Sequence, residues 1–522
     1  MKKHLSTSVY TFRDVINENC MYVDKTKEIF AMVQKPKGQY FLSRPRRFGK
    51  SMTLSTLESI FLGEKELFKG LYIYDQSYDW KKYPIIRLAL NNYSSDTAEQ
   101  LKEKLNSYFD KTSIDEGLKY YGKDPSSKFG ELINYYSENY GKVVILIDEY
   151  DKPILDNILN KEEVVKIRTL LKQFYGIIKG HEEHIRFTFI TGVSKFTQVS
   201  IFSDLNNLTD ISMIQDFAAI CGFTEEECLH YFAEWIEENA IKNGISRGDY
   251  IAKLKYMYDG IRFTEKELYV YNPVSFTSAM EYGDFKHYWF ETGTPTFLLR
   301  LLKEYNYDIP HCENMQLTAD TFSSYEVDNI RLEPLLYQTG YLSIKDYDKE
   351  TGIFTLSYPN EEVRSAFVKR LVEYFTPVDM AKVPSLIEQT RTALLENNLD
   401  DLFDILNEFY AKIDYTIKIK HEKYYQTIFY IFFTLLGYRI KVEVNTNKGR
   451  MDAVVQTDKF IYLFEFKLNK SAAEALAQIK VREYYKRYQT DNRKKILLGI
   501  SFNDQTGEIR EWVREEILNF EF

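Results

Sequence analysis

Short apolar runs separated by segments with helical spacing characterise the N-terminal part of the chain. Four runs are predicted as β-strands: Gln39–Leu42 and the runs within 83–94, 142–154 and 184–197. Between them, apolar residues recur every three or four positions, as at Leu54, Leu57, Ile60 and Phe61. Strands that are apolar almost throughout and alternate with helices predict a parallel sheet covered by helices on both faces. The fold class is therefore α/β.

The pattern becomes mostly helical from residue 221 onward, where Thr224 and Glu227 have the spacing of a capping box. Within 330–375, a helix, two alternating runs with a turn near Asp348–Gly352 and another helix predict a winged-helix-like arrangement. From residue 418 onward, the pattern predicts helix, three strands, helix, strand and a final helix. The 522 residues are enough for several domains.

The segment Ile461–Leu468 combines a strand-like apolar pattern with two charged residues. Because side chains alternate faces along a strand, Glu465 and Lys467 lie on the face of Leu463, and the neighbouring phenylalanines lie on the other. Moving a carboxylate and an ammonium out of water is costly unless they are paired or bind a charged group. These two residues alone favour an ion pair at the end of a strand over a hydrolytic site.

Composition and charge narrow the class of protein. Hydrophobic residues make up 44% and charged residues 28%, which is typical of a folded chain. The net charge of -9 argues against a general nucleic-acid binder, although segment 420–522 holds 18 Lys and Arg against 14 Asp and Glu. Four scattered cysteines, no apolar N-terminal signal and no run of membrane-spanning length predict a cytoplasmic protein without a membrane partner.

The segment RPRRFGKS lies between a predicted strand and a predicted helix. A phosphate-binding loop needs backbone N–H groups around the phosphates, a lysine for the β- and γ-phosphates and a hydroxyl for Mg²⁺. Lys50 and Ser51 supply the last two, with Ser51 as the metal ligand, whereas Arg44 replaces the usual first glycine. The whole segment is predicted to bind nucleotide: Arg44, Pro45, Arg46, Arg47, Phe48, Gly49, Lys50 and Ser51.

Acidic residues end the next apolar run, VVILIDEYD. In P-loop ATPases, an aspartate at this place holds Mg²⁺ and an adjacent glutamate can polarise the attacking water. We therefore predict Asp148 as a metal-binding and nucleotide-binding residue and Glu149 as a catalytic one. Asp151 is expected to crowd against these two acids, and a bound Mg²⁺ would ease their repulsion. Thr191 and Ser194 are alternative sensors of the γ-phosphate, and Thr191 is the predicted nucleotide contact.

Further segments complete a set that resembles a known family. They are YVDKT (22–26), ILIDEYDKPI (145–154), FITGVSKFTQVSIFSDLNNL (189–208) and CGFTEEE (221–227), beside the RPRRFGKS loop. With them the chain resembles, over nearly its whole length, bacterial AAA-ATPase-like proteins that carry a C-terminal PD-(D/E)XK nuclease-like domain. The resemblance implies a P-loop ATPase of the additional-strand class that uses ATP and Mg²⁺. It also implies that an arginine in place of the first glycine is usual in this family.

The same resemblance gives the charged residues of the C-terminal strands a role. Phosphodiester hydrolysis uses oxygen ligands for a hard metal ion and a cation near the attacking water or the developing charge. Asp452, Glu465 and Lys467 match this motif on a hairpin predicted to turn at Thr457–Asp458. The resemblance thus implies that Asp452 and Glu465 bind the metal and that these three residues, with Gln478, are catalytic.

The helix predicted after this hairpin begins with a capping-box sequence, Ser471 to Glu474. Helical spacing then places Gln478, Arg482 and Tyr485 on one face. Two acids on the preceding helix and strand are expected to support the site: Glu422 and Glu443.

Several other residues have plainer interpretations. Arg46 and Arg47 fit equally as loop cations, as phosphate contacts, or as a finger that reaches a neighbouring subunit, which leaves a homo-oligomer open. Arg262 is expected to form a structural ion pair. Three residues are expected to serve packing: His287, Trp289 and Phe290. Tyr22 and Asp24 are placed near the nucleotide by the resemblance alone.

The motifs predict four domains: a P-loop AAA-like ATPase core (1–220), a helical subdomain (221–310), a winged-helix-like part with a helical connector (311–400), and a restriction-endonuclease-like α/β domain of the PD-(D/E)XK type (401–522). The expected function is an ATP-regulated, Mg²⁺-dependent nuclease acting on nucleic acid, DNA by preference. The alternative is a nucleotide-dependent switch whose nuclease-like domain is a docking scaffold. The complete set of Asp452, Glu465 and Lys467 favours the nuclease, because a scaffold has no need of all three.

Overall fold

A computed structural model describes most of the chain and divides it into two compact units. The described residues are 3–9, 11–195, 202, 205, 207–289, 296–305, 312, 314–323, 331–375, 383–411, 428–433, 440–446, 449–503 and 508–517. The first unit comprises 1–297 and 314–363, and the second comprises 298–313 and 364–522. This division does not follow the four expected domains one for one, and their boundaries stay a prediction.

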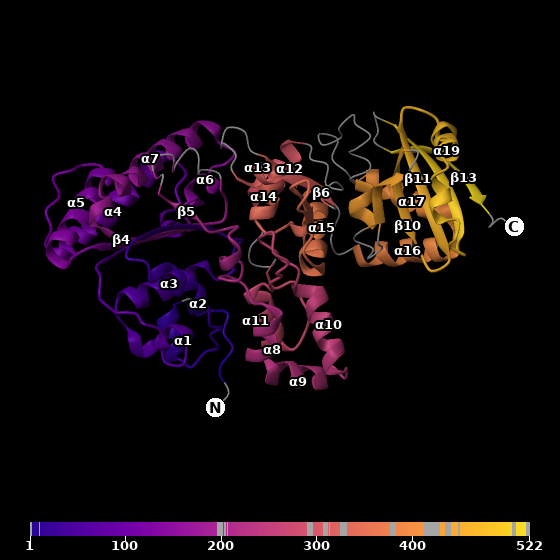
Figure 1. Cartoon of the computed structure of the whole chain (residues 1–522). Helices are drawn as coiled ribbons and strands as arrows, with labels where there is room; N and C mark the ends of the chain where they lie inside the picture. The colour runs from indigo at the N-terminus through magenta and orange to yellow at the C-terminus, as the bar shows by residue number, and fades with distance from the viewer. Residues whose placement is uncertain are drawn as a thin grey trace. The chain divides into compact units, whose positions relative to one another are not determined.

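A five-stranded parallel sheet forms the centre of the first unit (Figure 1). Its order is β2-β3-β4-β1-β5. The strands are β1 (Gly38–Ser43), β2 (Ile85–Ala89), β3 (Val143–Asp148), β4 (Ile185–Gly192) and β5 (Thr209–Asp210). β4 therefore lies between the strand that precedes RPRRFGKS and the strand that ends in Asp148. This inserted strand is the additional strand that the sequence predicted.

Helices cover both faces of this sheet, as the nearly continuous apolar strands require (Figure 1). On one face, α3 (Lys50–Phe61) packs Leu57 and Phe61 into a core with Phe187 and the apolar residues of β1. On the other face, Tyr175 of α7 (Lys161–Gly180) reaches Phe41 of β1 through a chain of aromatic contacts. The remaining helices of this part are α1 (Phe12–Asn17), α2 (Thr26–Val33), α4 (Ala98–Glu116), α5 (Pro125–Tyr140) and α6 (Lys152–Asp156).

A helical region follows, and its first helix begins with the predicted capping box: the Glu227 N–H donates to Thr224 Oγ1 and the Thr224 N–H to Glu227 Oε2. The helices are α8 (Glu225–Tyr231), α9 (Ala233–Lys242), α10 (Arg247–Tyr258), α11 (Pro273–Tyr282) and α12 (Thr296–Glu304). The predicted order of helix, hairpin and helix is then observed, with a third strand added to the hairpin. These elements are β6 (Met315–Thr318), α13 (Ala319–Ser323), α14 (Leu332–Gln338), β7 (Ser343–Asp348), β8 (Ile353–Ser357) and α15 (Glu361–Phe375).

The second unit contains a mixed five-stranded sheet of order β13-β12-β11-β10-β9. Its elements are α16 (Val383–Glu396), α17 (Leu399–Ala411), β9 (Ile440–Thr446), β10 (Gly449–Gln456), β11 (Phe460–Leu468), α19 (Ala472–Val481), β12 (Lys494–Phe502) and β13 (Ile509–Ile517). The final helix expected from the sequence is wrong, because this segment is strand β13, paired antiparallel with β12. The apolar residues of this segment have helical spacing, but the segment forms a strand because it pairs with the free edge of β12.

The predicted alternation of faces along β11 is confirmed. Leu463 packs in a core with Ile479 of α19, whereas Phe464 and Phe466 pack against Phe429 on the opposite face. Glu465 and Lys467 accordingly share the face that α19 covers.

Gly499 of β12 lies directly opposite Glu465 in the parallel pairing of β11 and β12. A Cβ at Gly499 would lie 2.2 Å from the carbonyl oxygen of Ala472 and 2.6 Å from the nitrogen of Leu476, both in α19. No side chain fits in that space, so the glycine lets α19 approach the sheet beside the charged residues.

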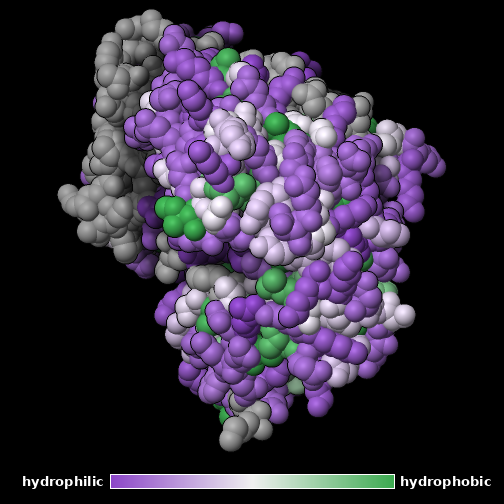
Figure 2. Space-filling model, turned by 90° about the vertical axis from the view of Figure 1, so that its left-hand side faces the viewer, coloured by the Kyte–Doolittle hydropathy of each residue, from purple (hydrophilic) through white to green (hydrophobic). Residues whose placement is uncertain are grey.

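The face in Figure 2 is predominantly hydrophilic, with hydrophobic residues in small scattered groups. Among the described residues, no helix is both long enough and apolar enough to cross a bilayer.

Candidate active sites

The loop between β1 and α3 has the backbone of a phosphate-binding turn. Arg47 and Gly49 both adopt left-handed conformations, with φ of 62° and 94°. No heavy atom lies within 4 Å of the position that a Cβ on Gly49 would take, which leaves open space beside the start of α3. Lys50 Nζ donates to the carbonyl oxygens of Arg44 (3.0 Å) and Pro45 (2.8 Å). The lysine is thus folded over its own loop, beside the open space at Gly49.

The hydroxyl of Ser51 and the carboxylate of Asp148 lie together at the edge of this loop. Ser51 Oγ donates to Asp148 Oδ2 at 2.6 Å, although 97 residues separate the two. Both come from the places where Mg²⁺ is held in P-loop enzymes, the helix after the loop and the end of the acidic strand. Two oxygen donors in contact fit a hard cation such as Mg²⁺. These residues would hold the ion, and their role remains a proposal.

Glu149 follows Asp148 in a left-handed conformation, with φ of 52°. Its N–H donates to Asp148 Oδ1 at 3.0 Å, so the turn is fixed by the aspartate itself. Burial raises the pKa of the Glu149 carboxyl, and the nearby cations Lys50 and Arg46 oppose that rise. Burial also lowers the pKa of Lys50, against the pull of Asp148 and Glu149. The arrangement places two acids and two cations around the open loop.

Asp151 lies near these acids, since its charge adds to the effect of burial in raising the pKa of Glu149, but its carboxylate is bound elsewhere. Its carboxylate accepts hydrogen bonds from the N–H groups of Val193 and Ser194 and from Ser194 Oγ at 2.6 Å. It therefore ties the turn after β3 to the end of β4. Ser194 is engaged by this contact, whereas Thr191 Oγ1 is buried and has no hydrogen-bond partner among the residues that the structure describes. The sensor role of Thr191 stays a prediction.

The side chain of Arg44 is built into the framework of the loop. Its guanidinium donates to the carbonyl oxygens of Ser43 (2.9 Å), Ser212 (2.8 Å) and Phe217 (3.2 Å) and lies 4.0 Å from the centre of the Phe263 ring. The side chain is 1% exposed. An arginine can therefore stand in the position of the usual glycine because its side chain points away into the protein. Its contribution to nucleotide binding stays a prediction.

The other loop residues differ in exposure. Phe48 is buried against Phe263, Pro45 is buried, Arg46 is half-buried and Arg47 is exposed. The exposure of these four residues does not show whether they contact a nucleotide. Their role in nucleotide binding therefore stays a prediction.

The YVDKT segment braces the core from outside the loop. Asp24 accepts hydrogen bonds from the N–H groups of Thr26 (2.8 Å) and Tyr72 (2.7 Å), and Lys25 forms a 2.6 Å ion pair with Glu227. The contacts with Tyr72 and Glu227 join the segment to other parts of the first unit. The Arg262 guanidinium likewise donates to the carbonyl oxygens of Thr264 (2.9 Å) and Glu265, so these are the bonds observed where an ion pair was expected.

Asp452, Glu465, Lys467 and Gln478 converge on one face of the C-terminal sheet. Lys467 Nζ lies 3.3 Å from Glu465 Oε1, and Gln478 Nε2 of α19 donates to the same oxygen. Asp452, next to the last β10 residue paired with β11, accepts the N–H of Phe466 at 2.7 Å. The hairpin turns at Thr457, as predicted.

Glu465 has the unusual environment in this group. Its Oε2 atom is buried and has no hydrogen-bond partner in the described part of the chain, and the residue is 1% exposed. Burial, and next the charge of Asp452, raise the pKa of Glu465 to about 8, against the opposing effect of Lys467. A buried, unpaired carboxylate oxygen facing a second carboxylate fits a divalent cation, which would relieve both penalties. No three His, Cys, Asp or Glu side chains converge as a ready-made metal site within the described ranges.

The structure corrects the expected face of α19 and adds a residue. The helix ends at Val481, and Glu483 takes a left-handed conformation, so Tyr484 is the tyrosine that is fully buried, while Tyr485 is half-buried against the same cluster. Tyr484 is 2% exposed. Burial raises the pKa of its phenol, the charges of Glu465 and Asp452 raise it as well, and the hydrogen bond with Gln478 lowers it. Of the predicted capping box, the bond from the Glu474 N–H to Ser471 Oγ is present. Glu422 and the side chain of Glu443 lie outside the described residues.

Two family models match the chain in the places where these two sites lie. One, described as "Predicted AAA-ATPase", matches residues 6–202, and the other, described as "PD-(D/E)XK nuclease superfamily", matches residues 420–512. A protein of Azotobacter chroococcum mcd 1, described as "Uncharacterized protein in vnfD 5'region", is 34% identical over 528 residues, 99% of each chain. The chain belongs to the AAA-ATPase-like proteins with a C-terminal PD-(D/E)XK nuclease domain. The architecture of this AAA-ATPase-like protein is therefore shared along its whole length with a relative from Azotobacter.

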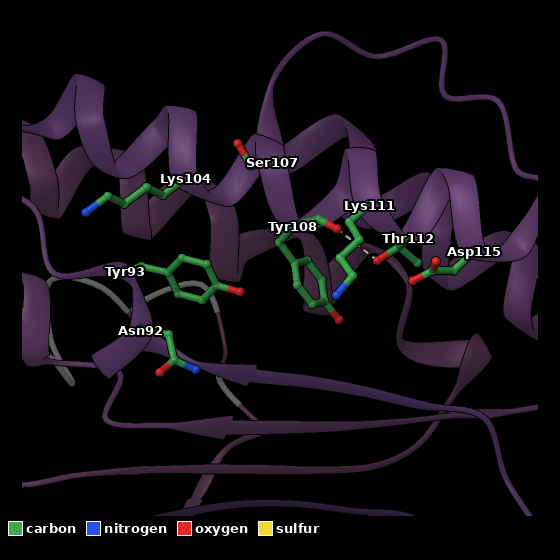
Figure 3. Close-up of a pocket in the computed structure, with 8 residues that line it drawn as sticks. All are labelled: Asn92, Tyr93, Lys104, Ser107, Tyr108, Lys111, Thr112 and Asp115. Carbon is green, nitrogen blue, oxygen red and sulfur yellow. Dashed lines mark hydrogen bonds between the residues drawn. The ribbon is translucent and has the colours of Figure 1, made fainter.

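A separate groove of about 520 Å³ lies on the AAA-ATPase-like part, between α4 and the turn that follows β2 (Figure 3). Tyr93 and Tyr108 line it together with Lys104 and Lys111. None of the predicted site residues lines this groove. The chemistry predicted from the sequence is therefore placed elsewhere.

The raised pKa of Glu465 makes metal binding depend on pH. An acid whose pKa is higher in the folded than in the unfolded state adds to the stability of the metal-free fold. For Glu465 this contribution is complete below the pKa of the unfolded chain and is lost as the pH rises through about 8. Since a cation must displace the Glu465 proton, Mn²⁺ affinity should rise by up to about tenfold per pH unit below that pKa and level off above it.

Calorimetric titration of Mn²⁺ at several pH values, in buffers of different ionisation enthalpy, measures both the affinity and the released proton. The Glu465→Gln variant is the control, because it has no proton to release. A Mn²⁺ affinity that is constant across this range in the wild-type protein would contradict the prediction.

Proposed function

We propose that this protein is an ATP-regulated nuclease, with ATP bound and hydrolysed at the β1–α3 loop and nucleic acid cleaved at the C-terminal sheet. One observation carries the proposal: Lys467 and Gln478 hold one oxygen of the buried Glu465 carboxylate, its other oxygen has no partner in the described part of the chain, and Asp452 lies on the adjacent strand. A docking scaffold gains no stability from the second oxygen of Glu465, because a buried carboxylate oxygen without a hydrogen bond is costly.

At the nucleotide site, each residue has a specific task. Lys50 would move its ammonium from the carbonyl oxygens of Arg44 and Pro45 to the β- and γ-phosphates. Ser51 and Asp148 would hold Mg²⁺, which supplies charge neutralisation on the phosphates when bound. Glu149, with its pKa raised by burial, would orient and deprotonate the attacking water.

At the C-terminal site, Asp452 and Glu465 would hold Mg²⁺, which supplies Lewis-acid activation at a phosphodiester when bound. Lys467 lies beside these carboxylates and would stabilise negative charge that develops on the phosphate. Gln478 fixes the orientation of the Glu465 carboxylate through its amide. The partner proposed is nucleic acid, DNA by preference, and the proposed location is the cytoplasm.

The test compares cleavage of single-stranded and duplex DNA and RNA by the wild-type protein and the Lys467→Ala variant, with Mg²⁺ or Mn²⁺, in the presence and absence of ATP. We expect cleavage by the wild type and a loss of about a hundredfold or more in the variant, as for other charge-stabilising residues. Lys470→Ala is the matched control, because Lys470 is an exposed lysine just beyond the same strand.

The alternative outcome is equally informative. If ATP is hydrolysed but no nucleic acid is cleaved under any of these conditions, the nuclease proposal is wrong and a nucleotide-dependent switch with a docking domain replaces it. If cleavage occurs but is the same with and without ATP, regulation by ATP is wrong and the nuclease remains.

A further inference from the structure

The outer side of the nucleotide loop is covered by residues that lie far along the chain. Trp289 Nε1 donates to the carbonyl oxygen of Arg46 at 3.0 Å. Gly340 packs against the same loop, because a Cβ on it would lie 2.9 Å from Cβ and Cγ of Pro45. Trp289 is 4% exposed. Trp289 was predicted to serve packing alone, but it also donates a hydrogen bond to the backbone of the loop. Phe290 lies outside the described residues.

The end of β4 is held by the same part of the chain. The Lys195 N–H donates to Gln338 Oε1 of α14 at 2.8 Å, and Lys195 Nζ forms a 2.8 Å ion pair with Asp210. Gln338 is the last residue of α14, two positions before Gly340. The end of α14 thus contacts both the nucleotide loop and the strand that carries Thr191.

Trp289 also has a second connection, through its backbone. Its N–H donates to Glu362 Oε1 at 2.9 Å, and the Glu362 side chain lies in the first turn of α15 with the residue 1% exposed. α15 begins in the first compact unit, and its later residues belong to the second. One residue therefore links the nucleotide loop to the helix by which the chain leaves the first unit.

From these contacts we infer that Trp289 and Gln338 are positioning residues that sense the nucleotide state of the loop and pass it to α14 and α15. The inference rests on the proposed function, because it needs a nucleotide at the loop. Lys50 now satisfies the carbonyl oxygens of Arg44 and Pro45, and its transfer to a phosphate removes both bonds. The next carbonyl oxygen along the loop, that of Arg46, is the one bound to Trp289.

Coupling between two sites is reciprocal, so a contact that responds to the nucleotide must also influence its affinity. Trp289→Phe keeps an aromatic ring in the packing but removes the N–H that reaches Arg46. We expect this variant to bind the fluorescent nucleotide mant-ATP, with Mg²⁺, about fivefold or more differently from the wild type. Gln338→Leu, which removes the acceptor for Lys195, should change the affinity as well.

Hydrogen–deuterium exchange of the full-length protein supplies a readout that a merely structural role would not affect. In the wild type, mant-ATP should change the protection of 332–348 and 361–375, and in Trp289→Phe this response should be lost while the melting temperature without nucleotide is retained. Trp235→Phe is the matched control, because Trp235 lies in α9 in the helical region and is half-buried.

Each outcome decides the inference. If the wild type binds mant-ATP but the exchange of 332–348 and 361–375 does not respond, or if Trp289→Phe responds like the wild type, the inference is overturned and the proposed ATP site remains. If the wild type fails to bind mant-ATP, the proposed function at this loop is overturned and the inference is overturned with it.

Discussion

Lys50→Ala should reduce ATP hydrolysis by about a hundredfold or more in a protein that remains folded. The ammonium is the only charged group that the structure places in contact with the loop carbonyl oxygens of Arg44 and Pro45, among the residues described. Loss of a preorganised positive group at the phosphates typically costs about 10²–10³ in rate. Burial lowers the pKa of Lys50, so its charge is costly to keep, whereas its removal leaves the carbonyl oxygens of Arg44 and Pro45 without this donor. Phosphate release from ATP, measured beside the melting temperature, is the assay.

Lys37→Ala is the control for this variant. Lys37 also lies beside β1, but its ammonium forms an ion pair with Glu182 at the surface, where such pairs contribute little. ATP hydrolysis should be unchanged in Lys37→Ala. If Lys50→Ala still hydrolysed ATP at the wild-type rate, this loop would not be the site of hydrolysis. The proposed nucleotide site of the AAA-ATPase-like part would then be wrong.

Asp452→Ala should abolish cleavage of nucleic acid, with a loss of about a thousandfold, and leave ATP hydrolysis within about twofold of the wild type. The variant removes one of the two carboxylates proposed to hold the metal and frees the N–H of Phe466 that Asp452 accepts. It also lowers the pKa of Glu465, since the charge of Asp452 is one cause of its rise. Cleavage and ATP hydrolysis are measured on the same preparation.

Asp458→Ala tests whether any acid in this hairpin would serve. Asp458 is exposed in the turn between β10 and β11, six residues from Asp452, and its removal should leave cleavage intact. If Asp452→Ala lost both activities in a folded protein, the two sites would not be separable, and a model with one shared site would be needed.

The parts of the fold that depend on local periodicity could be predicted from the sequence. The alternation of side chains along β11 placed Glu465 and Lys467 on one face correctly, because a strand has only two faces. The capping box at Thr224 was also correct, since its two bonds join residues only three apart. The segment 509–517 failed because its pairing with β12 depends on a neighbour that local spacing does not show.

The contacts made at a distance account for most of what the sequence did not show. Asp151 was expected to crowd against Asp148 and Glu149, but the sequence did not show its donors, Val193 and Ser194, which come from the end of another strand. Tyr484 was missed because helical spacing was extended past the end of α19, where the chain turns at Glu483. The hydrogen bond from Trp289 to Arg46 crosses more than two hundred residues of chain, and no local pattern marks it.

The close approach of α19 to Gly499 offers a way to tell working relatives from inactive ones. The site depends on its two acids and its lysine, and it also depends on a backbone gap opposite Glu465. A relative with a larger residue at that position would push α19, and Gln478 with it, away from the sheet while every charged residue stayed in place. Such a protein would carry an intact motif and a disassembled site.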